Sequence, residues 1–240
     1  MQIDVVSIFP GMFPAVFGDS ILGRAQAAGQ LTIRVHDLRR WTHDKRRTVD
    51  DRPYGGGPGM VMKPEPIFEA VEALRTHCGS HGKAAAACET ILLSPQGEPL
   101  TARLAETLAS REHLLLLCGH YEGVDERVKS LTARSVSIGD YVLTGGELPA
   151  MVLVDAIARF IPGVIGHDQA TEEESFAAGL LEYPQYTRPP VFRGLAVPEI
   201  LLSGDHEQIA QWRKVQSVER TAAARPDLVK QRRKSSKQRG

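Results

Sequence analysis

Five short apolar runs set the fold class of this 240-residue chain. Each run is too short for a typical helix, and stretches with helical periodicity lie between most of them. Strands that alternate with helices are typical of a parallel sheet covered by helical crossovers, so we expect an α/β fold. The predicted strands are Ile3–Ile8, Leu31–Val35, Thr90–Leu93, Leu114–Cys118 and Val136–Ile138, and the predicted helices are Phe13–Ala28, Pro64–His77, Thr101–Ala109 and Leu148–Phe160.

Glycine-rich loops follow two strands that are consecutive in the sequence. GHYEG occupies Gly119–Gly123, and SIGDYVLTGGELP occupies Ser137–Pro149. Glycine tolerates a positive φ and lets the backbone approach a ligand closely. Ligands bind beyond the carboxyl ends of the strands in an open α/β sheet, and we expect these two strands to be neighbours, so the loops predict one pocket. The segment SPQGEP, Ser94–Pro99, is either a third wall of that pocket or a simple turn before a helix.

Familiar motifs for nucleotide, metal and ester chemistry are absent. GSHGKA, residues 79–84, lacks the glycine spacing and the Ser or Thr of a phosphate-binding loop, and no GxGxxG follows the first strand. Ala210 stands where the second histidine of an HExxH zinc site would be, and no GxSxG marks a serine nucleophile. Cys78, Cys88 and Cys118 fit neither a disulfide framework nor a CxxC zinc site, which favours a reducing compartment.

Charge is segregated along the chain, although the formal net charge is zero. From Gln211 to Gly240 there are ten Lys or Arg residues and two acidic residues, and RRWTHDKRR spans Arg39–Arg47. The acidic stretch Ile165–Thr187 contains no Lys or Arg. Basic regions beside an acidic one indicate a polyanion bound around a site that needs carboxylates. Ordinary solvated surface charge is the alternative.

The loop RRTVDDRPYGGGPGM, Arg46–Met60, mixes cations, carboxylates and glycines. Arginines bind phosphates, and aspartates accept hydrogen bonds from N1 and N2 of guanine, so the loop favours recognition of an RNA base in its backbone context. A solvated loop with internal ion pairs is the alternative.

After Phe160 the sequence loses the clear periodicity of strands and helices. We expect a first domain over 1–160, a linker rich in proline and glycine over 161–190, and a helical domain with a basic tail over 191–240. Asp205 and Gln208 have the spacing of a capping box at the start of a helix. The last ten residues are too polar and basic to fold alone. No run approaches the roughly 18 apolar residues of a membrane helix, and no signal peptide begins the sequence, so we expect a cytoplasmic protein.

Seven runs of sequence occur in the order found in a known enzyme family: THDKRRTVDDRPYGGGPGM, LSPQG, GHYEGVDERV, SIGDYVLTGGELPAM, RFIPGV, YPQYTRPP and LLSGDH. Over nearly the whole chain they resemble the bacterial TrmD family, the tRNA (guanine-N1)-methyltransferases that use S-adenosylmethionine. The resemblance implies a SPOUT-type fold, in which the parallel sheet ends in a C-terminal trefoil knot, an exception to the rule against threaded chains. It also implies an obligate homodimer with its active site between the subunits.

The resemblance further implies that three knot loops, residues 93–97, 119–123 and 138–146, bind S-adenosylmethionine. Adenine is expected to contact mainly backbone groups of Ile138, Tyr141 and Leu143. Tyr121 and Glu122 are expected near the ribose and the amino-acid portion. The expected cofactor-binding residues are Leu93, Ser94, Pro95, Gln96, Gly97, Gly119, Tyr121, Glu122, Gly123, Ile138, Gly139, Asp140, Tyr141, Val142, Leu143, Gly145, Gly146 and Pro149.

The reaction requires a base, because guanine N1 carries a proton at neutral pH and becomes a good nucleophile only when that proton leaves. A cation near O6 stabilises the charge that develops there. The resemblance places this cation at Arg159 and the base at the carboxylate before the dipeptide SF. Relatives have aspartate there, but an ungapped register puts Glu174 at this position, which moves the carboxylate by roughly 1 Å. Glu173 and Asp168 are the alternative bases.

By resemblance, the substrate is the guanosine at position 37 of tRNA, beside the anticodon. The C-terminal domain is expected to bind the anticodon arm, with an affinity that falls steeply with salt, and the target base is expected to flip out of its stack. Family behaviour suggests Mg²⁺, but no ligand cluster in the sequence establishes a metal site. The expected RNA-contacting residues are Arg46, Arg47, Asp50, Arg52, Gly55, Gly59, Glu182 and Arg188.

Two other interpretations stay open at this point. A SPOUT enzyme could methylate another RNA or a 2′-hydroxyl, which needs no deprotonation of guanine. A catalytically degenerate RNA-binding module would explain the basic regions and the glutamate at position 174.

Overall fold

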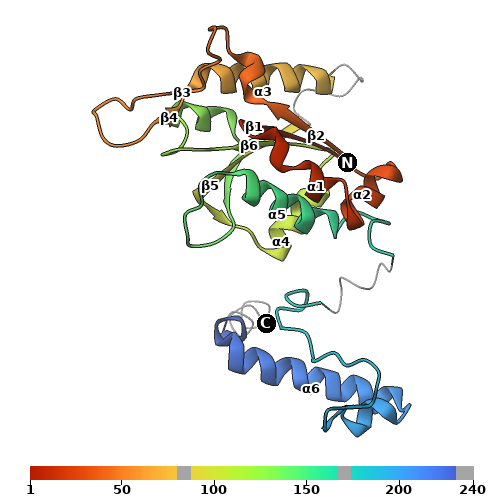
Figure 1. The fold of residues 1–240 in the computed structure, drawn as a ribbon. Helices are drawn as coiled ribbons and strands as arrows, with labels where there is room; N and C mark the ends of the chain where they lie inside the picture. The colour runs from red at the N-terminus through yellow and green to blue at the C-terminus, as the bar shows by residue number, and fades with distance from the viewer. Residues whose placement is uncertain (80–87, 167–173, 231–240) are drawn as a thin grey trace, which may run out of the picture. The chain divides into compact units, whose positions relative to one another are not determined.

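The computed structural model describes residues 1–79, 88–166 and 174–230. The chain divides into two compact units, Met1–Gly166 and His167–Gly240 (Figure 1). The first unit contains a five-stranded sheet in which all neighbouring strands are parallel. This confirms the predicted α/β fold with a parallel sheet. In spatial order the strands are β2 (Thr32–Asp37), β1 (Gln2–Ser7), β6 (His113–Cys118), β5 (Cys88–Pro99) and β7 (Arg134–Ser137).

Helices cover both faces of this sheet, as Figure 1 shows. One face packs on α3 (Pro64–Gly79), and the opposite face packs on four helices. Because the strands are buried on both faces, Leu114–Cys118 is a continuous apolar run without alternation. The four helices on the second face are α1 (Pro14–Phe17), α2 (Ser20–Ala27), α4 (Ala102–Ala109) and α5 (Glu147–Ala158).

The predicted helix Phe13–Ala28 is wrong as a single element. Helix α1 ends at Phe17, with Gly18 as its C-cap, and Asp19 adopts an extended conformation with φ −122° and ψ 172°. Its side chain accepts a hydrogen bond from Ser20 N at 2.6 Å and so caps a second helix, α2. Aspartate favours this N-cap position over a helix interior, because its carboxylate satisfies a free backbone N–H.

The strand β5 extends past the predicted Thr90–Leu93 and includes SPQGEP. Its register against β7 shifts between Leu93 and Glu98, and both residues pair with Val136. The four residues between them therefore bulge out of the ladder at the carboxyl end of the sheet.

A two-stranded ribbon carries the Arg46–Met60 loop. Its strands, β3 (Asp50–Asp51) and β4 (Val61–Met62), pair antiparallel. The loop between them extends away from the sheet in Figure 1. Short 3₁₀ helices span Pro10–Met12, Leu38–Trp41 and Glu126–Leu131 in this unit.

The second unit contains α6 (His206–Ala224), the hairpin of β8 (Val191–Phe192) and β9 (Leu195–Ala196), and a 3₁₀ helix at Glu199–Leu202. The predicted cap of α6 is confirmed, because Asp205 Oδ1 accepts from Gln208 N at 3.1 Å. The Gln208 side chain donates to the Asp205 carboxylate instead of accepting from Asp205 N as in a capping box, and Asp205 N donates to Ser203 Oγ at 3.1 Å.

Residues of the predicted linker pack on α6. Leu181 N donates to Thr221 Oγ1 at 2.8 Å, and the Arg213 guanidinium lies 4.7 Å from the centre of the Tyr183 ring. The division at residues 160 and 190 stays a prediction, and the predicted disorder of the last ten residues lies outside the described residues. Within the described ranges, no helix is long and apolar enough to cross a membrane.

A carboxylate with two histidine partners joins three strands of the sheet. Asp4 on β1 is 2% exposed, and its side chain lies 2.5 Å from His36 Nε2 on β2 and 2.7 Å from His113 Nε2 on β6. Burial raises the pKa of Asp4, but hydrogen bonds from His113, His36 and Gln2 outweigh it and hold the pKa well below its ordinary value of 3.8. The ionised form of Asp4 is therefore the form that the fold stabilises.

We expect Asp4→Asn to lower the free energy of unfolding at pH 7 by about 3 kcal/mol, because it removes a buried charge that the buried His113 and the half-buried His36 contact. The folded-state pKa is lowered, so this stabilisation is complete above the unfolded-state pKa and is lost as the pH falls below it toward the folded-state value. Urea titrations at pH 7 and pH 3 measure both effects. Glu106→Gln, an exposed substitution on α4, is the control; equal unfolding midpoints for the two variants would contradict this role of Asp4.

Candidate functional site

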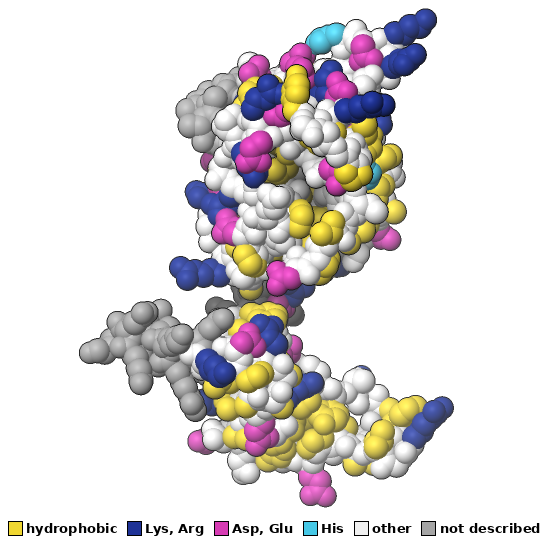
Figure 2. All heavy atoms as spheres, turned by 90° about the vertical axis from the view of Figure 1, so that its left-hand side faces the viewer, with side chains coloured by type: hydrophobic (Ala, Val, Ile, Leu, Met, Phe, Trp, Pro, Cys, Tyr) yellow, Lys and Arg dark blue, Asp and Glu magenta, His cyan; other side chains and the backbone are white. Residues whose placement is uncertain are grey.

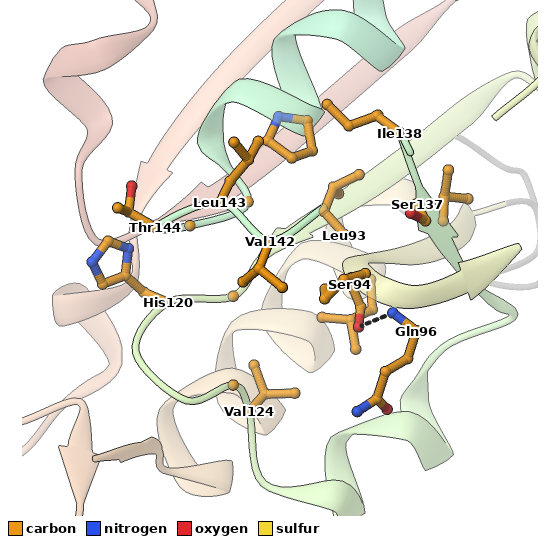
Figure 3. Close-up of a pocket in the computed structure, with 18 of the residues that line it drawn as sticks. Leu93, Ser94, Gln96, His120, Val124, Ser137, Ile138, Val142, Leu143 and Thr144 are labelled. Atoms are coloured by element: carbon orange, nitrogen blue, oxygen red, sulfur yellow. Dashed lines mark hydrogen bonds between the residues drawn. The ribbon is translucent and has the colours of Figure 1, made fainter. Parts of the chain in front are cut away.

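Three loops at the carboxyl ends of β5, β6 and β7 line a pocket in the first unit (Figure 3). The expectation that the two glycine-rich loops follow neighbouring strands is wrong, because β5 lies between β6 and β7. The bulge of β5 forms the middle wall of the pocket, and the two loops flank it. The segment SPQGEP thus contributes a wall rather than a simple turn. All of the expected cofactor-binding residues except Gly97 and Asp140 line this pocket, and their binding role stays a prediction.

The middle wall depends on a close approach between β5 and β7. A Cβ at Gly97 would lie 2.4 Å from Val136 N, so only glycine allows the bulge to pack this tightly. Ser94 Oγ accepts a hydrogen bond from Gln96 N at 3.2 Å, drawn in Figure 3. Gly97 therefore shapes the pocket from behind and does not line it.

The second wall is a tight turn over Gly119–Gly123. Tyr121 has φ 60° and Gly123 has φ 132°, and Gly123 N donates to the carbonyl of His120 at 3.1 Å. Burial and the neighbouring carboxylate of Asp50 raise the pKa of the Tyr121 hydroxyl. Glu122 N donates to the carbonyl of Met60 at 3.0 Å, which ties this turn to the end of the Arg46–Met60 loop.

The third wall, residues 138–146, contains the two adjacent glycines. The sequence predicts that they bring the backbone close to a ligand. Both line the pocket, but their closest approach is to the chain itself: a Cβ at Gly146 would lie 2.7 Å from Cys118 Cα. Gly146 N also donates to the carbonyl of Gly119 at 2.7 Å. The glycines thus hold the second and third walls together.

The sequence prediction omitted eight residues that line this pocket, His120 among them, and it also omitted Glu147, which lies behind the lining. His120 lines the pocket, and its ring packs edge-on against Phe9, with 4.9 Å between ring centres. Glu147, the first residue of α5, is 2% exposed directly behind Gly145 and Gly146. The position of His120 inside GHYEG could have indicated that it lines the pocket, whereas no sequence pattern indicates that Glu147 is buried.

The Arg46–Met60 loop reaches the same pocket through its two ends. Asp50 lies beside Tyr121, and the Glu122 side chain packs on Gly59, where a Cβ would lie 2.4 Å from Glu122 Cγ. Met62 N donates to the carbonyl of Gly123 at 2.9 Å. The remaining residues predicted to contact RNA in this loop are exposed: Arg46, Arg47, Arg52 and Gly55.

Arg159 lies at the other end of α5 from the pocket. Gly146 is the N-cap of this helix and lines the pocket, whereas Arg159 is the C-cap. At a rise of 1.5 Å per residue, the two are about 20 Å apart along the helix axis. The half-buried Arg159 is therefore not part of the pocket formed by its own chain.

The proposed base belongs to the second unit. Glu174 lines a cavity there with Leu181, Tyr183, Arg213 and Lys214, among others. Glu182 N donates to Ser175 Oγ at 3.0 Å, and Arg188 is exposed. The alternative bases Glu173 and Asp168 lie outside the described residues. The structure thus places Arg159 and Glu174 in different units and does not fix their separation.

Neither thiols nor metal ligands form a cluster in the described ranges. Cys88 and Cys118 are both buried. Burial, with a contribution from the charge of Glu147, raises the pKa of the Cys118 thiol. Across residues 1–79, 88–166 and 174–230, no group of three or more His, Cys, Asp or Glu side chains is arranged to hold a metal ion.

Comparison with known proteins gives a match over almost the entire chain. Residues 1–231 match the family model described as tRNA (Guanine-1)-methyltransferase TrmD. The chain is 56% identical over 230 residues to the tRNA (guanine-N(1)-)-methyltransferase of Moorella thermoacetica, covering 95% of this chain and 90% of that protein. It is 52% identical over 231 residues to the protein of the same name from Bacillus subtilis, covering 96% and 93%.

Proposed function

The chain belongs to the TrmD family of tRNA (guanine-N1)-methyltransferases, and from this premise we propose that it transfers a methyl group from S-adenosylmethionine in the three-loop pocket to N1 of guanosine 37. The observation that carries the proposal is the convergence of three strand-end loops on one pocket, held together by Gly97 and Gly146. A tRNA guanine-N1 methyltransferase uses S-adenosylmethionine as its methyl donor, and the pocket supplies a place for it.

The pocket has surfaces that fit the parts of this donor. Apolar side chains of Leu93, Val124 and Leu143 line it, which suits the adenine ring (Figure 3). The carboxylates of Glu122 and Glu126 also line it, which suits an ammonium group. When bound, the donor supplies a methyl group already activated by its sulfonium charge.

The proposed fold includes the trefoil knot of the SPOUT class. Support comes from how tightly the three loops interlock. Leu93 and Glu98 both pair with Val136, and Leu100 N donates to the carbonyl of Ser137 at 2.7 Å. Gly146 packs on Cys118. These contacts hold segments around residues 93–100, 118–119 and 136–146 against one another.

We also propose that two copies of the chain form the enzyme. On α5, Leu148 is 50% exposed and Val152 is 46% exposed, and their i, i+4 spacing places them on one face. Tyr141, Val142 and Leu143, which also line the pocket, add exposed apolar surface, and Figure 2 shows hydrophobic side chains exposed on the surface of the first unit. Such a patch is typical of a protein interface. A second copy explains how Arg159 could serve a pocket that its own chain does not bring near.

The chemistry assigned to this chain consists of one proton transfer and one charge contact. Glu174 takes the proton from guanine N1, which leaves N1 with a lone pair that can accept the methyl group. Arg159 stabilises the charge that develops at O6. The tRNA is held by the exposed arginines of the Arg46–Met60 loop, and the second unit binds the anticodon arm.

The site of methylation tests this function. We expect radiolabelled methyl from S-adenosylmethionine to appear in 1-methylguanosine at position 37 after incubation with unmodified tRNA. A tRNA with adenosine at position 37 is the matched control and should accept no label. Label in a 2′-O-methyl nucleoside would instead indicate the alternative SPOUT chemistry, and no label in any nucleoside would indicate a binding module.

A further inference from the structure

A buried carboxylate lies behind the pocket wall at the start of α5. Ser7 Oγ donates to Glu147 Oε1 at 2.7 Å, and Ser7 Oγ itself accepts from Phe9 N at 2.8 Å. Glu147 Oε2 lies 3.8 Å from His120 Nδ1, too far for a hydrogen bond. In the described part of the chain, the buried Nδ1 atom of His120 has no hydrogen-bond partner. Glu147 thus places in this wall a carboxylate that is hydrogen-bonded to Ser7 but not to His120.

The backbone of Gly145 and the ring of His120 lie between this carboxylate and the pocket. A Cβ at Gly145 would lie 2.3 Å from Glu147 Oε2 and 2.4 Å from His120 Nδ1, and Gly145 and His120 both line the pocket. Because residue 145 has no side chain, only its backbone and one imidazole ring shield the pocket from the carboxylate. Its charge is poorly screened there, since solvent does not reach it.

We infer that Glu147 is a specificity determinant that makes the pocket prefer the cationic methyl donor over the neutral thioether product. The donor and product differ by the methyl group and by one positive charge at sulfur. A fixed negative charge behind the wall attracts the positively charged sulfonium, whereas it has no such attraction for the neutral thioether. The residue therefore favours donor binding and product exchange after each transfer. This inference rests on the proposed binding of S-adenosylmethionine in this pocket.

Calorimetric binding to the full-length protein tests the inference with three ligands. S-adenosylmethionine and sinefungin carry a positive charge at or beside the sulfur position, whereas S-adenosylhomocysteine is neutral there. We expect Glu147→Gln to weaken binding of both cationic ligands by on the order of tenfold and to leave S-adenosylhomocysteine within about twofold. The amide oxygen of glutamine still accepts the hydrogen bond from Ser7. Ser7→Ala, which removes that bond but keeps the charge, is the matched control and should preserve the wild-type ratio of affinities.

A purely structural role would weaken all three ligands alike, and that result would overturn the inference. If Glu147→Gln does not fold, as judged by thermal melting, Glu147→Asp keeps the charge. We expect that variant to retain the preference for cationic ligands, and equal affinities for all three would overturn the inference. If the wild-type protein binds none of the three ligands, the proposed function itself fails, which is a different result.

Discussion

Glu174→Gln is expected to lower the rate of single-turnover tRNA methylation by about 10³-fold, because the amide cannot take the proton from guanine N1. The affinity for S-adenosylmethionine should stay within about twofold, since Glu174 lies in the second unit and the pocket is formed by the first. Rapid-quench methylation with enzyme in excess measures the chemical step without product release.

Two further variants make the assignment of the base specific. Glu199→Gln changes an exposed glutamate of the second unit and should methylate at the wild-type rate. Glu174→Asp keeps a carboxylate on a side chain shorter by one methylene and should stay within about 10²-fold of wild type, because the carboxylate moves by roughly 1 Å. A near-normal rate for Glu174→Gln would refute the assignment and point to Glu173 or Asp168.

Gly146→Ala is expected to lower the affinity for S-adenosylmethionine by at least about 100-fold and the free energy of unfolding by about 3 kcal/mol. The added Cβ would lie 2.7 Å from Cys118 Cα and 3.0 Å from Gly119 N. Both atoms belong to the backbone at the end of β6, so the second and third walls of the pocket must separate. Calorimetric titration and thermal melting measure the two effects.

Gly11→Ala is the matched control for this substitution. A Cβ at Gly11 would meet no atom within 4 Å, and its φ is not positive, so we expect wild-type stability and affinity. An affinity for S-adenosylmethionine within threefold of wild type in Gly146→Ala would show that the close packing of Gly146 on β6 does not maintain the pocket.

The fold class and the pocket loops could be predicted because they depend on local signals. Apolar runs such as Leu114–Cys118 identify buried strands, and glycines after them identify the loops. The break at Asp19 was missed because a helical pattern continues across it, although aspartate is a good N-cap. The length of β5 was missed because a bulge keeps its pairing with β7 beyond Leu93, and no local pattern reports that pairing.

The candidate site was predictable to the same extent. The loop residues that line the pocket follow strand ends, and strand ends are visible in the sequence. His120 and Glu147 were missed because their roles depend on the burial of Glu147 and on how close the two side chains lie, which no sequence pattern shows. Arg159 and Glu174 came from resemblance, and the structure places them in different units.

The sequence by itself determined the α/β class, the family and the three loops, because strand, helix and turn preferences act over a few residues. Only the tertiary structure decided that β5 lies between β6 and β7, that Gly146 packs on Cys118, and that Ser7 meets Glu147 across 140 positions. The physical reason is that close packing and buried charge depend on groups far apart in the chain. Their partners are chosen by the folded sheet rather than by neighbours in the sequence.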